Sequence, residues 1–163
     1  MKIIIAGAGI GGLTAALCLN EAGFEVEIFE SVKSVKPLGV GINLLPHSVR
    51  VLTNLGLDDQ IAESAVETSD LVYANKHGQI FWEEPRGRFA GYKWPQFSVH
   101  RGTLQMLLLN EVENRLGSDS IKTQHHLSAF AETPYGITAT FINRETGELQ
   151  TKVKGDLLIG ADG

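Results

Sequence analysis

The sequence is poor in cysteine and in long apolar runs. Its one cysteine, Cys18, has no disulfide partner within the chain, which fits a reducing, cytoplasmic compartment. Because Cys18 lies in a helical pattern rich in Ala and Leu, we expect a buried apolar residue rather than a nucleophile. No apolar run approaches the roughly 20 residues that a membrane-spanning helix needs. The first strand pattern starts almost at Met1, so we expect no signal or transit peptide.

An excess of positive charge is also missing. The formal net charge is −5, the pI is about 5.5, and no block of like charges interrupts the chain. We therefore expect neither a nucleic acid nor a membrane as partner. The five histidines, which include the adjacent His125 and His126, lack the spacing of metal ligands, so we expect no metal site. A chain of 163 residues, 43% hydrophobic and 20% charged, is long enough for one globular domain with its own core.

The N-terminal residues follow a strand, helix, strand pattern. Lys2–Ala6 is an apolar, β-branched run typical of a buried parallel strand. Six residues from Gly7 to Gly12 follow it, and Leu13–Ala22 then predicts a helix that Gly23 ends. A second strand, Glu25–Phe29, has the acidic Glu30 at its carboxyl end.

The remaining chain mixes helices with antiparallel patterns. Gly and Pro residues predict extended loops before and after the central hairpin, and the last apolar run leads directly to Gly160-Ala-Asp-Gly163. Because that buried strand has no following element, we expect the chain to be a fragment. The expected elements are a loop over Ser31–Leu45, a helix over Ser48–Leu55 after Pro46, a short helix capped by Asp58, a hairpin of Leu71–Ala74 and Gln79–Glu83, a loop over Arg86–Pro95, a helix over Leu104–Leu116, a second hairpin of Gly136–Ile142 and Glu148–Val153, and a strand over Asp156–Ile159.

The glycine run between strand and helix predicts a nucleotide site. Gly7 permits the tight turn, Gly9 lets a pyrophosphate approach the backbone, and Gly12 lets the helix pack closely on the sheet. The helix N-terminus offers free N–H groups and the positive end of its dipole. Glu30 can accept hydrogen bonds from a ribose hydroxyl, and its charge disfavours a 2′-phosphate there. The motif alone does not separate FAD from NAD, although the long Gly-rich loop and the hairpin after the second strand favour a flavin fold.

The whole ordered set of motifs resembles the group A flavoprotein monooxygenases, which include para-hydroxybenzoate and salicylate hydroxylases. The motifs are Gly7–Gly12, Glu30, the stretch from Pro37 to Asn43, His100-Arg-Gly-x-Leu104 and Gly160–Gly163. Glu84-Pro-Arg-Gly87 and the segment from Pro95 to Arg101 are similar in particular to the phenazine-1-carboxylate-type hydroxylases. The resemblance implies an α/β fold: a Rossmann-like FAD-binding domain with a parallel sheet and an antiparallel β-meander insertion, of which residues 1–163 are the N-terminal part.

The resemblance also implies roles for individual residues. The glycines would line the FAD pyrophosphate, Glu30 with Ser31 would hold the adenosine ribose, and Leu127 would bind the adenine through its backbone. The loop at Gly39 and Gly41 would run beside the flavin. The residues so implied are Gly7, Gly9, Gly11, Gly12, Glu30, Ser31, Gly39, Gly41, Arg101, Leu127 and Asp162. Arg101 would contact FAD, as a guanidinium suits phosphate and polar oxygens, and Asp162 matches the acidic residue of the family's DG motif.

Simpler interpretations of three residues stay open at this point. Arg101 could be a helix-start arginine in a surface salt bridge, Asp162 a turn or N-cap residue, and Glu30 a solvated strand end.

In the resembled family, NAD(P)H reduces FAD, and the reduced flavin forms a C4a-hydroperoxide with dioxygen that hydroxylates an aromatic ring. The cofactor performs that chemistry, so we assign no catalytic residue in this chain. The family's proteins are more than twice as long, and we expect this chain alone to be inactive. Two other classes stay open: a different flavin- or nicotinamide-dependent oxidoreductase, such as a dehydrogenase, and a non-catalytic nucleotide-binding module. The residues do not distinguish NADH from NADPH. They identify neither the aromatic substrate nor the oligomeric state.

Overall fold

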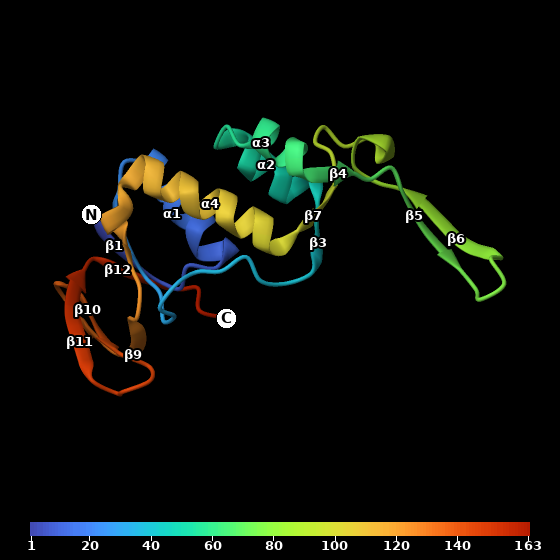
Figure 1. Ribbon diagram of the computed structural model, residues 1–163. Helices are drawn as coiled ribbons and strands as arrows, with labels where there is room; N and C mark the ends of the chain where they lie inside the picture. The colour runs from blue at the N-terminus through green and yellow to red at the C-terminus, as the bar shows by residue number, and fades with distance from the viewer. The chain divides into compact units, whose positions relative to one another are not determined.

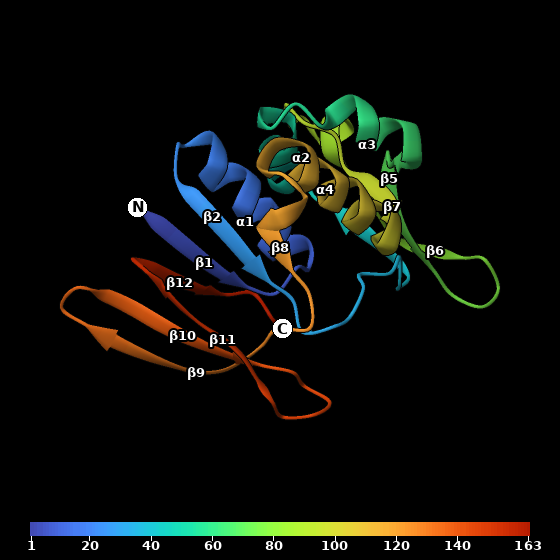
Figure 2. The same cartoon turned by 60° about the vertical axis from the view of Figure 1, so that its left-hand side comes forward.

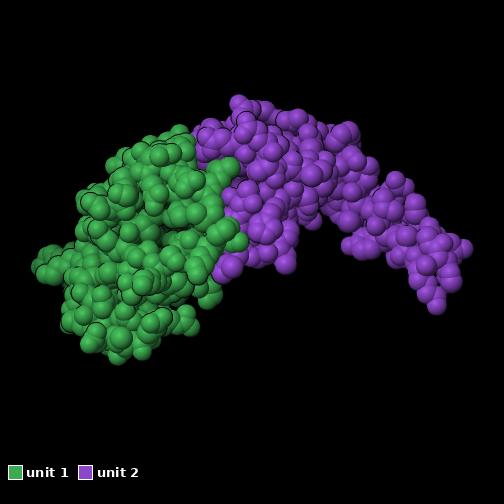
Figure 3. All heavy atoms as spheres, in the orientation of Figure 1, with its two compact units in different colours: residues 1–37, 105–163 green, residues 38–104 purple.

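The computed structural model describes residues 1–163, and the chain divides into two compact units (Figure 3). Unit 1 comprises residues 1–37 and 105–163, and unit 2 comprises residues 38–104. Helix α4 (Arg101–Leu116) begins in unit 2 and continues into unit 1. None of the helices is long and apolar enough to span a membrane.

Unit 1 is built on a four-stranded parallel sheet with strand order β12-β1-β2-β8. One of its two inner strands, β1, carries three consecutive isoleucines, Ile3, Ile4 and Ile5, which are all fully buried. A continuous apolar run suits a strand that is covered on both faces. The elements of unit 1 besides α4 are β1 (Lys2–Ala6), α1 (Ile10–Glu21), β2 (Glu25–Phe29), η2 (Ser118–Ser120), β8 (Ile121–Lys122), β9 (His126–Thr133), β10 (Gly136–Ile142), β11 (Leu149–Gly155) and β12 (Leu157–Gly160).

Two layers cover this sheet. Helix α1 packs against β1 and β2 through its buried residues, which include Leu13 and Leu17. The antiparallel meander β9-β10-β11 covers the opposite face, as Figure 2 shows. The rings of Phe29 and Phe141 stack there with their centroids 4.1 Å apart. The parallel sheet with an antiparallel meander confirms the predicted fold class.

Helix α1 starts three residues earlier than the sequence pattern predicts. The expected start was Leu13, whereas the helix begins at Ile10 with Gly9 as its N-cap. Glycine is a poor helix former, so the local pattern places Gly11 and Gly12 in the turn rather than in the helix. In the structure both glycines lie within the helix, and Gly12 packs closely on the carbonyl group of Gly7.

Unit 2 contains a three-stranded antiparallel sheet with strand order β3-β7-β4. The prediction of loops over residues 31–45 and 86–95 was wrong in part: β3 forms within the first, and the short 3-10 helix η1 forms within the second. Strand β3 is short and pairs with residues more than 50 positions away, so its local sequence carries little signal. The elements of unit 2 besides α4 are β3 (Gly41–Leu44), α2 (Pro46–Asn54), α3 (Asp58–Ser64), β4 (Ala65–Glu67), β5 (Asp70–Ala74), β6 (Ile80–Pro85), η1 (Gly87–Ala90) and β7 (Phe97–His100).

The hairpin β5–β6 is the least buried part of unit 2. The two strands pair only with each other and extend as a ribbon (Figures 1 and 2). Their aromatic residues are exposed, with Phe81 at 70% and Trp82 at 55% of full accessibility. The core of unit 2 lies instead between its sheet and helices α2 and α3, where Val49, Leu52, Leu57, Ile61, Phe97 and Val99 are buried.

Candidate functional site

The carboxyl ends of β1, β2 and β12 meet at one edge of the parallel sheet. Gly7 follows β1, Glu30 follows β2, and Ala161 follows β12. Two backbone hydrogen bonds close this edge, from Gly7 N to Phe29 O at 2.7 Å and from Ala161 N to Ala6 O at 2.7 Å. The crevice outside such strand ends is where open α/β sheets bind their ligands.

Gly7 and Gly12 are required by the packing of the turn itself. Gly7 has φ +112°, and a Cβ atom there would collide with the carbonyl oxygen of Ala161. A Cβ atom on Gly12 would overlap the carbonyl oxygen of Gly7 and would lie 3.3 Å from the Ala161 side chain. These two glycines therefore need no ligand to explain them.

No packing contact within the protein requires glycine at positions 9 and 11. Gly9 has φ −72° and ψ 175°, which any residue adopts. The nearest atom to a Cβ built on Gly9 is the Ala161 oxygen at 3.9 Å, and a Cβ on Gly11 meets nothing within 4 Å. Open space thus lies beside the first turn of α1, where a ligand could contact the backbone.

The start of α1 is uncapped and carries no protein anion. Gly9 supplies no side-chain cap, and no acidic residue lies in the first turn. The N–H groups of a first helical turn have no partner within the helix, and the helix dipole makes this end electropositive. An anion placed here would gain both hydrogen bonds and charge stabilisation.

Glu30 is fixed beside this turn by three hydrogen bonds. Its Oε2 accepts a bond from Ala8 N at 2.8 Å, while its Oε1 accepts bonds from Val32 N at 3.0 Å and from the Ser31 hydroxyl at 3.1 Å. A carboxylate has about four acceptor positions, so one position remains for a hydroxyl donor. This half-buried, oriented carboxylate differs from the freely solvated strand end that the sequence left open.

Asp162 lies at the same edge. Its backbone nitrogen would be 2.9 Å from a Cβ atom on Gly7, so the chain passes directly beside the glycine turn. The Asp162 side chain is exposed and forms neither a hydrogen bond nor an ion pair. It therefore caps no helix and closes no turn.

A second group of predicted residues lies within unit 2. Gly39 has φ +124°, and a Cβ atom there would lie 3.2 Å from Cδ of Arg101. Arg101 donates from its backbone N to Val40 O at 3.0 Å and from Nη1 to Leu38 O at 3.3 Å. Gly41 pairs with His100 across β3 and β7. The structure thus brings Gly39, Gly41 and Arg101 together, and Arg101 takes part in no salt bridge.

Leu127 lies on β9, an edge strand of the meander. Its side chain packs against the cluster that contains Ala6 and Phe29, the residues just before Gly7 and Glu30. The register of β9 shifts at Ser128, between the pairs Phe141–Leu127 and Thr140–Ala129. The proposed backbone contact of Leu127 with adenine stays a prediction.

Sequence reasoning missed the residues that brace the glycine turn from a distance. Gln105, on α4, donates from Nε2 to the carbonyl oxygen of Ala8 at 3.0 Å. Gln124 adopts a left-handed conformation with φ +60° and donates its N–H to Val32 O at 3.0 Å. His125 N donates to Glu30 O at 2.8 Å. No local signal marks these residues, because their partners lie about 90 positions away or more.

Two other candidate chemistries find little support in the geometry. Burial raises the pKa of the half-buried Cys18 thiol, and the neighbouring Glu21 carboxylate adds to that effect, so the thiol is held in its unreactive, protonated form. No group of three or more His, Cys, Asp or Glu side chains is placed to hold a metal ion.

A model of the FAD-binding domain family matches residues 1–163, the whole of the chain. The chain belongs to this family. The FAD-binding domain is 44% identical over 162 residues to a phenazine 1,6-dicarboxylic acid hydroxylase of Lysobacter antibioticus, covering 99% of this chain and 40% of that protein. This similarity confirms the resemblance to phenazine hydroxylases.

More distant relatives agree with this assignment. An FAD-dependent urate hydroxylase of Klebsiella pneumoniae is 29% identical over 177 residues, covering 100% of this chain and 40% of that protein. The crystal structure of Klebsiella pneumoniae HpxO with FAD and uric acid superimposes with a TM-score of 0.78 at 28% identity, covering 100% of this chain and 39% of that one. The FAD-binding domain thus spans about 40% of the length of these relatives.

The site at the glycine turn fits the adenosine and pyrophosphate part of FAD. The uncapped first turn of α1 suits the two phosphates, and the space beside Gly9 and Gly11 admits them. The remaining acceptor position of Glu30 suits a ribose hydroxyl.

Proposed function

We propose that the FAD-binding domain is part of an NAD(P)H-dependent flavoprotein monooxygenase that hydroxylates an aromatic or heteroaromatic ring. The observation that carries the proposal is the open, uncapped start of α1 beside Gly9 and Gly11, with Glu30 oriented next to it. Relatives named as hydroxylases of a phenazine acid and of urate support the ring substrate. Dioxygen is the co-substrate that a monooxygenase reaction requires.

The residues at the glycine turn have distinct proposed tasks. The backbone of Gly7, Gly9, Gly11 and Gly12 holds the pyrophosphate through first-turn N–H groups. Glu30 accepts a hydrogen bond from the adenosine ribose, and its negative charge disfavours a 2′-phosphate at that position.

The remaining assignments extend the same proposal. Ser31 keeps the Glu30 carboxylate oriented through its 3.1 Å hydrogen bond. Leu127 binds the adenine through its backbone, Asp162 lies at the pyrophosphate, and Arg101 contacts FAD near Gly39 and Gly41.

Bound FAD supplies the redox chemistry, which is the transfer of electrons from NAD(P)H and the activation of dioxygen. The chain's own residues bind and orient the cofactor. We assign none of them to proton transfer, because no titratable group at the glycine turn pairs with a second one in the manner of an acid and a base.

A calorimetric titration of the chain with FAD, run beside NADH and FMN, tests the cofactor part of the proposal. We expect FAD to bind most tightly, because FMN lacks the adenosine half that Glu30 would hold. Binding of NADH without a response to FAD would favour a nicotinamide-dependent dehydrogenase instead. A chain that binds neither would contradict the proposed roles of Gly9 and Glu30.

The monooxygenase part needs a separate test in a longer protein that contains these residues. We expect NAD(P)H oxidation to be stimulated by an aromatic substrate, with one atom of isotopically labelled dioxygen appearing in the product. Oxidation of the substrate without incorporation of label would identify a dehydrogenase or an oxidase.

A further inference from the structure

Ala8, which lies between Gly7 and Gly9, is fully buried, and side chains hold both polar groups of its backbone. Its N–H donates to Glu30 Oε2 at 2.8 Å, and its carbonyl oxygen accepts a hydrogen bond from Gln105 Nε2 at 3.0 Å. No other donor bonds to that oxygen. Because a buried backbone carbonyl without a partner costs free energy, Gln105 contributes to the stability of the turn.

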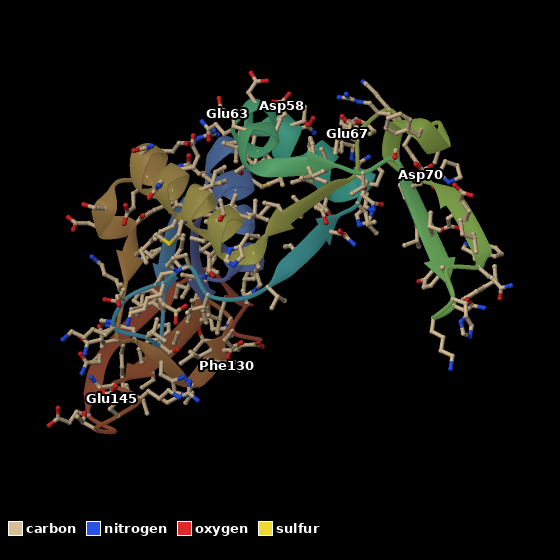
Figure 4. The ribbon with its side chains drawn as sticks, turned by 45° about the vertical axis from the view of Figure 1, so that its right-hand side comes forward. Asp58, Glu63, Glu67, Asp70, Phe130 and Glu145 are labelled. Atoms are coloured by element: carbon tan, nitrogen blue, oxygen red, sulfur yellow. The ribbon has the colours of Figure 1, made fainter.

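Gln105 reaches the turn from a separate helix. It lies on α4, 97 positions along the chain from Ala8, and it is half-buried. The part of α4 that belongs to unit 1 lies beside α1 in the three views of Figures 1, 2 and 4. Leu108 and Val112 on the same part of α4 are fully buried, so packing holds the helix that presents the amide of Gln105 to Ala8.

The hydrogen bond from Gln105 also sets the direction of the next N–H group along the chain. The peptide bond between Ala8 and Gly9 is trans, as are all peptide bonds of the structure. In a planar trans peptide the C=O and N–H bonds point in opposite directions. Because the Ala8 carbonyl is directed toward Gln105 on α4, the N–H of Gly9 is directed away from α4.

The N–H of Gly9 is free for a ligand. It donates to no protein group. The space beside Gly9 is open, since a Cβ atom built there meets nothing closer than the Ala161 oxygen at 3.9 Å, and the first turn of α1 has no acidic residue. An N–H group whose direction is fixed before the ligand arrives binds an anion more tightly, because the protein does not need to reorganise on binding.

We propose that Gln105 is a positioning residue of the nucleotide site, because its hydrogen bond to the Ala8 carbonyl orients the Gly9 N–H toward the pyrophosphate of FAD. Gln105 itself touches no part of the nucleotide. The inference rests on the proposed function, since it requires that the first turn of α1 binds FAD. It adds a residue of α4, far from the glycine motif in sequence, to those that determine cofactor affinity.

Gln105→Met is the first test, because methionine has a side chain of similar length without a donor. We expect about a tenfold loss of FAD affinity in a calorimetric titration, since the Gly9 N–H is no longer held toward a charged oxygen. Val112→Ala is the control for stability, because it removes buried apolar contacts of α4, and Gln150→Met repeats the substitution at an exposed position of β11. Both controls should bind FAD as the unaltered chain does. Equal losses in Gln105→Met and Val112→Ala would overturn the proposal.

A double-mutant cycle separates the positioning role from a purely structural one. In Gly9→Ala the added methyl group keeps the pyrophosphate away from the Gly9 N–H, so the direction of that N–H no longer affects binding. Gln105→Met should therefore cause little further loss of FAD affinity in the Gly9→Ala background, although alone it causes a loss of about tenfold. A loss of the same size in both backgrounds would show that Gln105 affects FAD binding by another route, and it would refute the role.

Nuclear magnetic resonance of the unaltered chain decides if Gln105→Met does not fold. The chain is labelled with isotopic nitrogen in glycine and glutamine and is titrated with ADP. We expect ADP to shift the Gly9 amide resonance strongly and the Gln105 side-chain amide little, because Gln105 does not contact the nucleotide. A Gly9 resonance that does not move, or a Gln105 resonance that moves as much as Gly9, would overturn the proposal.

The same experiments separate the role of Gln105 from the proposed function. If the unaltered chain binds neither FAD nor ADP, the proposed function fails, and the role of Gln105 fails with it. If the unaltered chain binds FAD and Gln105→Met binds it equally tightly, only the role of Gln105 fails.

Discussion

Replacing Gly9 and Gly12 separately by alanine tests whether the glycines of the first turn serve the ligand or the fold. Both changes add a single methyl group within the same four-residue stretch. A Cβ atom on Gly9 would lie 3.9 Å from the Ala161 oxygen, an ordinary contact, whereas a Cβ atom on Gly12 would overlap the carbonyl oxygen of Gly7. We therefore expect Gly9→Ala to lose FAD affinity and Gly12→Ala to lose stability.

The expected effects on stability follow from these contacts. In Gly9→Ala the poorer N-cap costs roughly 0.5–1 kcal/mol, and the reduced entropy of the unfolded chain offsets it by about 0.4–1 kcal/mol, so the melting temperature should change little. In Gly12→Ala the backbone must shift, which costs about 1–3 kcal/mol or more. At about 2–4 °C per kcal/mol for a chain of this size, the melting temperature should fall by roughly 2–12 °C.

For FAD affinity, we expect the loss in Gly9→Ala, the variant whose stability changes little. The methyl group of Gly9→Ala occupies the space through which the pyrophosphate approaches, so we expect at least about a tenfold loss of affinity, or 1.4 kcal/mol. Differential scanning calorimetry and titration with FAD measure the two quantities on the same samples. Unchanged FAD affinity in Gly9→Ala, or an unchanged melting temperature in Gly12→Ala, would refute the reasoning.

Three further predictions concern neighbouring residues. Glu30→Gln should weaken FAD binding but not FMN binding in a titration, because only FAD has the adenosine ribose; Glu27→Gln, on the strand β2 that Glu30 follows, is the control, and an equal loss there would count against the role of Glu30. Gly11→Ala should raise the free energy of unfolding in urea by about 0.5–1 kcal/mol, since alanine is the better helix former and its Cβ meets no atom; a lower value would contradict the open space. Because the folded pKa of Cys18 is raised, the folded state keeps a proton that the unfolded state loses, so stability should fall as pH rises above the ordinary thiol pKa and not at lower pH. Cys18→Ala should remove that decline, and a decline of the same size in the variant would rule out the thiol as its cause.

Much of the fold was predictable because its signals are local. The isoleucines of β1, the glycine turn, the periodic helix α4 and the hairpins β5–β6 and β10–β11 each show their pattern within a short stretch of sequence. Strands β3 and β7 do not, because each has four residues and pairs only with distant partners. Asp58 also differs from expectation, since it is the first residue of α3 rather than its N-cap.

The candidate site divides in the same way. The types and order of Gly9, Gly12 and Glu30 predicted a nucleotide site, and the sheet places these residues at one edge. The sequence could not show that Gln105 holds Ala8, because the two residues are 97 positions apart. Nor could the sequence single out Gln96, because only the structure shows that this residue is buried while its side-chain amide forms no hydrogen bond.

The sequence by itself determined the family, the parallel strands and the chemistry of the glycine turn, because backbone freedom, apolar periodicity and a charged strand end are properties of residue types in order. Only the tertiary structure separated Gly7 and Gly12, which the fold requires, from Gly9 and Gly11, which it leaves free. It also decided that Arg86 forms a salt bridge with Glu84, whereas Arg50 forms no salt bridge. These distinctions depend on contacts between residues that are far apart in the sequence, and such contacts form only when the chain folds.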